Sequence, residues 1–174
     1  MVDKNTQEKQ FIEAYDKYAD AIFRYCYYRV FDREKAKDLL QETYCRAWKY
    51  VLSKKEVKNM RAFLYKIANN IIIDQSRKKK VSSLDQMMEK GFTPTASSSI
   101  QGENYLLGND VVGIVKTLPE KYRDVILMKY MDDLSTKEIA FALNETEDNI
   151  YVRISRGLSK VKEIFAQNEK KQLS

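Results

Sequence analysis

The scarcity of glycine and proline is the feature that most restricts how this chain can fold. Its 174 residues include only five Gly and two Pro, and long stretches contain neither. Sheet proteins need many turns, which these two residues commonly make. Apolar residues instead recur every three or four positions through several segments, as in amphipathic helices. We therefore expect an all-α fold.

Three amphipathic helices are predicted in the N-terminal half. The first spans residues 11–30 and has an aromatic-rich apolar stripe. The second follows Asp32, whose carboxylate can cap its first turn. The third spans residues 60–79 and leads into a basic run. Its predicted outer face interleaves aromatic, amide and basic side chains, a combination suited to stacking on bases and pairing with phosphates.

The middle of the chain lacks helical periodicity. Residues 81–104 are rich in Ser, Thr and Gly, which predicts a flexible linker. The chain then divides into a helical domain at residues 8–80, this linker, and a second helical domain at residues 105–168. The fold class predicted is therefore all-α, with two small helical domains.

The stretch from Leu134 to Leu158 predicts two short helices joined by a tight turn. Ser135 or Thr136 can cap the first helix, and Thr146 can cap the second. Asn144 tolerates the left-handed conformation that ends many helices. This arrangement is typical of a DNA-reading helix-turn-helix, although an ordinary helical hairpin in a bundle would show the same pattern.

Composition favours a polyanionic partner and disfavours catalysis. The formal net charge is +6 and the sequence pI is about 9.1. No histidine is present, so histidine triads, imidazole bases and the common His-containing zinc sites are excluded. There is no Gly-rich phosphate loop. We expect neither an enzyme nor a metal or cofactor site.

The two cysteines and the N-terminus indicate a cytoplasmic protein. Cys26 and Cys45 are far apart in sequence and are predicted to be buried free thiols in a reducing compartment. The first ten residues are polar, with no apolar run that could act as a signal or enter a membrane.

Three motifs, in order, resemble the extracytoplasmic-function class of bacterial sigma factors in the sigma-70 family. DLLQETYCRAW at residues 38–48 closely resembles region 2.2 of these factors. RAFLYKIANN at residues 61–70, with the following Ile-Asp pair and basic run, resembles regions 2.3 and 2.4. LPEKYR at residues 118–123, continuing through the helix-turn-helix, resembles region 4. The resemblance covers nearly the whole chain apart from its ends and the linker.

The resemblance implies a factor that binds RNA polymerase core and directs promoter recognition, DNA melting and transcription initiation. It also implies regulation by an anti-sigma protein. Contacts with the largest polymerase subunits are implied for Asp38, Gln41, Glu42 and Tyr44. An acidic and amide-bearing patch on a basic protein independently suits docking to basic partner residues.

Promoter contacts follow from the same resemblance. The single-stranded −10 element is implied to meet Lys54, Lys55, Asn59, Tyr65, Lys66, Asn69, Asn70, Arg77 and Lys78. The duplex −35 element is implied to meet Thr136, Lys137, Thr146, Asn149, Tyr151, Arg153 and Arg156.

Some residues depart from the family pattern, and other functions stay open. Asn144 stands where the family usually has glycine, and Glu147 and Asp148 at the start of the second helix would repel phosphates. A stand-alone helix-turn-helix regulator is the alternative function, but it leaves the first domain unexplained. An enzyme acting on nucleic acid is disfavoured by the absence of histidine and of a clustered acidic site.

Overall fold

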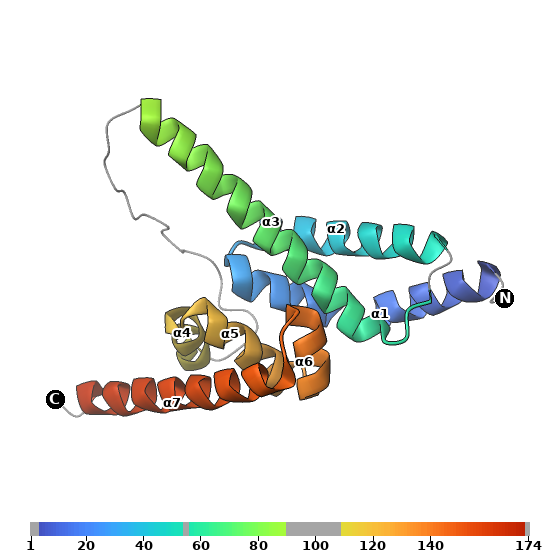
Figure 1. Cartoon of the computed structure of the whole chain (residues 1–174). Helices are drawn as coiled ribbons and strands as arrows, with labels where there is room; N and C mark the ends of the chain where they lie inside the picture. Colours follow the sequence, from blue (N-terminus) through green and yellow to red (C-terminus); the bar gives the residue numbers. More distant parts are fainter. Residues whose placement is uncertain (1–3, 54–55, 90–108, 173–174) are drawn as a thin grey trace.

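The computed structural model describes residues 4–53, 56–89 and 109–172, and this part of the chain is helical without strands (Figure 1). The predicted all-α class is therefore confirmed. The elements are α1 (Lys4–Val30), α2 (Arg33–Leu52), α3 (Met60–Glu89), α4 (Asn109–Thr117), α5 (Glu120–Ile126), the π-helix η1 (Leu127–Met131), α6 (Thr136–Leu143) and α7 (Glu147–Gln172).

Helices α1, α2 and α3 form the first domain. Asp32 caps α2, as predicted, by accepting a hydrogen bond from the backbone N–H of Lys35 at 3.0 Å. Helix α3 continues to Glu89 instead of ending near residue 79, so residues 81–89 are helical and not linker. This end of α3 projects away from the bundle (Figure 1), and Val81 is 59% exposed there, so the helix continues without packing on the core. The remaining linker residues, 90–104, lie outside the described part.

Helices α4 to α7 form the second domain, whose described part begins at residue 109. Helix α5 lies against α7 at Gly157. A Cβ atom at this position would lie 2.9 Å from Cγ1 of Ile126, so only glycine permits this close approach without a shift.

The two domains dock against each other through a shared apolar core. One buried cluster joins Ile22 and Tyr25 of the first domain to Leu134 and Ile139 of the second. A smaller cluster packs Tyr28 of α1 against Val115 and Leu127. Burial of apolar side chains from both domains therefore stabilises the docked arrangement.

The two cysteines differ in environment. Cys26 is buried in α1, and burial raises the pKa of its thiol to about 12. Cys45 is exposed, so the prediction that both thiols are buried is wrong for this residue. It lies on the outer side of α2, between the positions that face the core.

Candidate nucleic-acid and polymerase interfaces

The candidate polymerase face lies on the outer surface of α2. Asp38 and Gln41 are exposed, and Glu42 is partly exposed and forms an ion pair with Arg46. Gln41 and Glu42 follow Asp38 by three and four positions, so both lie on the same side of the helix as Asp38. The face therefore offers one carboxylate, one amide and one partly neutralised carboxylate to a partner.

Tyr44 does not lie on this face. It is 5% exposed, its ring packs edge-on against Phe11 and Tyr15, and its hydroxyl donates to the carbonyl oxygen of Ala14 at 3.4 Å. Direct contact with polymerase, implied by the family resemblance, does not fit this position. Tyr44 instead holds α1 against α2.

An apolar groove lies next to Tyr44, between the N-terminal part of α1 and α2. It encloses a volume of about 480 Å³ and is lined by Glu8, Phe11, Ile12, Tyr15, Tyr44, Cys45 and Trp48. The 61% exposure of Ile12 and the 46% exposure of Tyr15 follow from this open groove. These two residues belong to the apolar stripe of α1 but do not reach the core.

The predicted −10 residues are divided between exposed and covered positions. Asn70, Arg77 and Lys78 are exposed, as a DNA contact requires. Tyr65 is fully buried and Asn69 is 4% exposed, so the prediction of an outward orientation is wrong for both. Lys54 and Lys55 lie outside the described residues.

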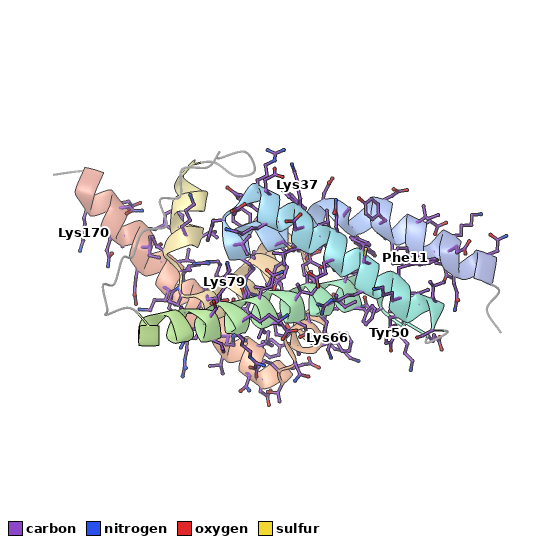
Figure 2. All side chains as sticks on the ribbon, turned by 90° about the horizontal axis from the view of Figure 1, so that it is seen from above. Phe11, Lys37, Tyr50, Lys66, Lys79 and Lys170 are labelled. Carbon is purple, nitrogen blue, oxygen red and sulfur yellow. The ribbon has the colours of Figure 1, made fainter. Side chains whose placement is uncertain are left out.

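The second domain is what covers this part of α3. Lys66 lies over the ring of Phe141 in α6, with Nζ 4.2 Å from the ring centroid, and Figure 2 shows Lys66 on the side of α3 nearest the second domain. Asn59 donates through Nδ2 to Oε1 of Glu138 at 2.9 Å. Two of the residues predicted to read −10 DNA, Asn59 and Lys66, are thus in contact with the chain's own second domain.

A buried arginine connects the same face to α5. Nη1 of Arg29 donates to Oδ1 of Asn69 at 3.0 Å and to Oδ2 of Asp124 at 2.8 Å, and Nη2 lies 2.8 Å from Oε1 of Glu120. The side chain of Arg29 is 3% exposed and that of Asp124 is 7% exposed. Burial raises the pKa of Asp124 to about 6, although the Arg29 charge opposes this rise.

A second arginine of α1 makes a parallel contact. Nη2 of Arg24 lies 2.7 Å from Oδ1 of Asp132, whose side chain is 2% exposed. Burial raises the pKa of Asp132, and the hydrogen bond from Arg24 opposes that rise. Neither the two arginines nor the two aspartates were predicted as site residues from the sequence. The available signal was the presence of two arginines in residues 22–31, a segment otherwise apolar and aromatic.

The helix-turn-helix has the predicted caps. Ser135 and Glu138 form a reciprocal capping box at the start of α6. Asn144 ends this helix in the left-handed conformation, with φ of 55°. Oγ1 of Thr146 accepts from the backbone N–H of Asn149 at 3.2 Å, which caps α7. The predicted local structure is confirmed.

The predicted −35 residues again differ in accessibility. Lys137, Tyr151 and Arg156 are exposed, whereas Thr136 is 9% exposed. Arg153 donates to the carbonyl oxygen of Lys121 at 2.9 Å through Nε, which fixes its guanidinium on the protein.

Asn149 is exposed and its Nδ2 donates to Oε2 of Glu145 at 3.1 Å. The exposed side chains at the start of α7 therefore combine an amide, an aromatic ring and one cation, Arg156, that could approach DNA. The geometry suits groove contacts with limited phosphate pairing.

Among the described residues, no group of three or more His, Cys, Asp or Glu side chains could hold a metal ion. No helix in the described ranges is long and apolar enough to cross a membrane.

Comparison with known protein families matches both domains. The family described as sigma-70 region 2 matches residues 14–81, and sigma-70 region 4 matches residues 109–161. The sigma factor SigW of Bacillus subtilis is 33% identical over 164 residues, which cover 88% of each chain. SigM of the same organism is 27% identical over 155 residues, covering 88% of this chain and 93% of the relative.

Two solved structures have a similar fold. The sigma factor RpoE of Bartonella quintana, crystallised with the anti-sigma factor NepR, aligns with a TM-score of 0.72 and 22% identity over 91% of this chain and 98% of its own. CnrH, solved with the cytosolic domain of CnrY, aligns with a TM-score of 0.66 and 18% identity over 92% and 90% of the two chains.

Proposed function

The chain belongs to the extracytoplasmic-function sigma factors of the sigma-70 family, and from this premise we propose which of its surfaces meet RNA polymerase and promoter DNA. A sigma factor binds polymerase core and directs promoter recognition, and it is not an enzyme. The observation that carries the assignment is the presence of regions 2 and 4 in order, with similarity to SigW over 88% of both chains. Its site of action would be the cytoplasm.

Polymerase docks on the outer face of α2 through Asp38, Gln41 and Glu42. The exposure of Asp38 and Gln41 supports this proposal, because a docking residue must be accessible in the free chain. The face would attract basic residues of the largest polymerase subunits. Tyr44 acts indirectly, by fixing α2 on α1.

Replacing Asp38 with lysine tests this docking face. We expect Asp38→Lys to bind core polymerase several-fold more weakly, because a positive charge would meet the basic partner surface. The control is Glu169→Lys, which makes the same charge change at an exposed site on α7. Titration of immobilised core should separate the two variants. Equal affinities would remove Asp38 from the interface.

The −10 element binds along α3 as a single strand. Asn59, Lys66 and Asn69 lie within three helical turns, and Arg77 and Lys78 extend the same helix with exposed charge. Extruding a base from the duplex costs a few kcal/mol, so stacking and hydrogen bonds must offset that cost. Lys54, Lys55, Tyr65 and Asn70 remain predicted members of this site.

The −35 element binds as duplex at the start of α7. The exposure of Asn149, Tyr151 and Arg156 beside the capped helix-turn-helix supports this assignment, since a recognition helix reads the major groove with such residues. Lys137, near the start of α6, and Thr146, which caps α7, are the remaining proposed contacts. Thr136 and Arg153 contribute indirectly, by stabilising the helices: Thr136 is buried, and Arg153 donates to the carbonyl oxygen of Lys121.

Run-off transcription with purified core polymerase tests the function as a whole. A promoter-specific transcript that appears only when this chain is present is the expected result. Specific DNA binding with no such transcript would instead favour the stand-alone regulator. An anti-sigma protein is a further proposed partner. It is supported by the similarity of the fold to RpoE and CnrH, and its binding would suppress the transcript.

A further inference from the structure

We propose that the second domain of the free chain closes the −10 face of the first and excludes promoter DNA until the two domains separate. This inference rests on the proposed function, because it identifies the occluded surface with the −10 site. It adds a regulatory contact made by the chain with itself, in which acidic residues of one domain occupy the cationic and amide groups of the other.

Several of the −10 residues make specific contacts within the docked chain. Asn59 is bound by Glu138, and Lys66 lies against Phe141. Asn69 is buried and accepts from Arg29, which is in turn held by Asp124. A DNA strand would need the amide of Asn59 and the ammonium of Lys66, both of which contact α6 of the second domain, so strand binding and docking are mutually exclusive.

Two arginine–aspartate pairs fasten the domains together. Arg24 pairs with Asp132 and Arg29 pairs with Asp124, and each aspartate side chain is less than a tenth exposed. Both arginines belong to α1, whereas the aspartates lie on either side of η1. We call these two pairs the arginine latch. Removing one member of a buried pair leaves the other charged and desolvated, which strongly disfavours the docked state.

The apolar contacts alone do not specify this geometry. A large and a small apolar cluster both join the domains, but the hydrophobic attraction that holds them has no preferred direction. The arginine latch fixes the register, since a guanidinium and a carboxylate pair in defined orientations. Opening must therefore break both pairs, after which polymerase or DNA can take their place.

Fluorescence energy transfer within the full chain measures closure directly. One dye is placed on the exposed Cys45 and the other on Ser159→Cys, an exposed position of α7. Cys26 stays unlabelled because it is buried and its raised thiol pKa suppresses the reactive thiolate. We expect high transfer in the otherwise unmodified chain, which indicates closure without any partner.

Asp132→Asn should lower the closed-to-open ratio by roughly tenfold or more, because Arg24 loses its charged partner. The matched control is Asp133→Asn, the same change at the neighbouring exposed residue. Asp133 has φ of 51°, a conformation that Asn accepts readily, so this control introduces no strain. Far-UV circular dichroism should show unchanged helix content in both variants.

A charge exchange provides the second variant. Asp132→Lys alone should open the chain, and adding Arg24→Glu should restore transfer, because the ion pair is re-formed with its charges exchanged. Low transfer in the unmodified chain, or unchanged transfer in Asp132→Asn, would overturn the inference. These readouts use neither polymerase nor DNA. An open unmodified chain that still supports transcription would refute self-closure alone, whereas closure without transcription would refute the proposed function alone.

Discussion

Asp124 brings a carboxylate into the interior of the docked molecule. Arg29, Glu120, Arg123 and Arg153 supply the charges around it. Only Oδ2 is bound by Arg29, and Oδ1 has no hydrogen-bond partner among the described residues. Because this buried carboxylate has a hydrogen-bond partner for only one of its oxygens, the pKa of Asp124 rises to about 6 in spite of the neighbouring Arg29.

The raised pKa of Asp124 predicts a pH dependence of stability. The folded chain binds this proton more tightly than the unfolded chain, in which the pKa is near 3.8. The stabilisation linked to protonation is complete below about 3.8 and is lost as the pH rises through about 6. The melting temperature of the unmodified chain, relative to Asp124→Asn, should therefore rise as the pH falls from 7.5 to 5.5. The opposite slope would contradict the assigned pKa.

Arg156 is the exposed cation best placed to hold a −35 phosphate. Arg156→Ala should weaken binding to promoter duplex and reduce the salt-dependence slope by about one unit, as expected for one lost phosphate contact. Lys162→Ala removes an exposed charge further along α7 and is the control. Fluorescence anisotropy at several salt concentrations gives the slope. An unchanged slope would exclude Arg156 as a phosphate contact.

Individual helices were predictable where their signals are local. The cap at Asp32, the capping box at Ser135 and the left-handed Asn144 each depend on a few neighbouring residues, and each is present. The extension of α3 to Glu89 was missed because Ser82 and Ser83 are typical of the start of a polar linker, whereas the helix continues through them. The π-helix η1 was also missed, since no local residue pattern marks the extra residue in its turn, and its buried residues Leu127 and Met128 pack against residues distant in sequence.

Two glycines of the second domain should respond in opposite directions to larger side chains. Gly157→Val should lower the free energy of unfolding by about 1–3 kcal/mol, because the added atoms meet Ile126 where α5 approaches α7. Gly113→Ala should raise it by up to about 1 kcal/mol, since a Cβ there meets nothing within 4 Å and alanine favours a helix. Urea titrations can measure both changes. A stabilising Gly157→Val would contradict the close approach.

For the whole molecule, the deciding contacts join distant parts of the chain. Arg24 and Asp132 are 108 residues apart, and no periodicity in the sequence relates them. The motifs predicted polymerase and promoter surfaces on the two domains, but they could not indicate that one domain covers the other. Tyr65 and Asn69 were therefore predicted to face outward, whereas both are buried in the docked chain.

Closure should affect the partners unequally. Asp132→Asn should bind a single-stranded −10 probe more tightly by about the factor by which its open fraction rises. Core polymerase binding through α2 should change little, because Asp38 and Gln41 are already exposed in the closed chain. Anisotropy of the probe and titration of immobilised core measure the two affinities, with Asp133→Asn as the control. Equal gains for both partners would contradict this separation.

The π-helix η1 also determines the direction in which Asp132 points relative to Asp124, and so whether both pairs of the arginine latch can form. The backbone N–H of Asp132 donates to the carbonyl oxygen of Leu127, five residues back, so this turn holds one residue more than an α-helical turn. Each residue of an α-helix advances by about 100°. Deleting one residue from η1 would therefore rotate Asp132 away from Arg24 while Asp124 kept its partner. A single codon lost or gained here could switch self-closure on or off among relatives, without replacing any contact residue.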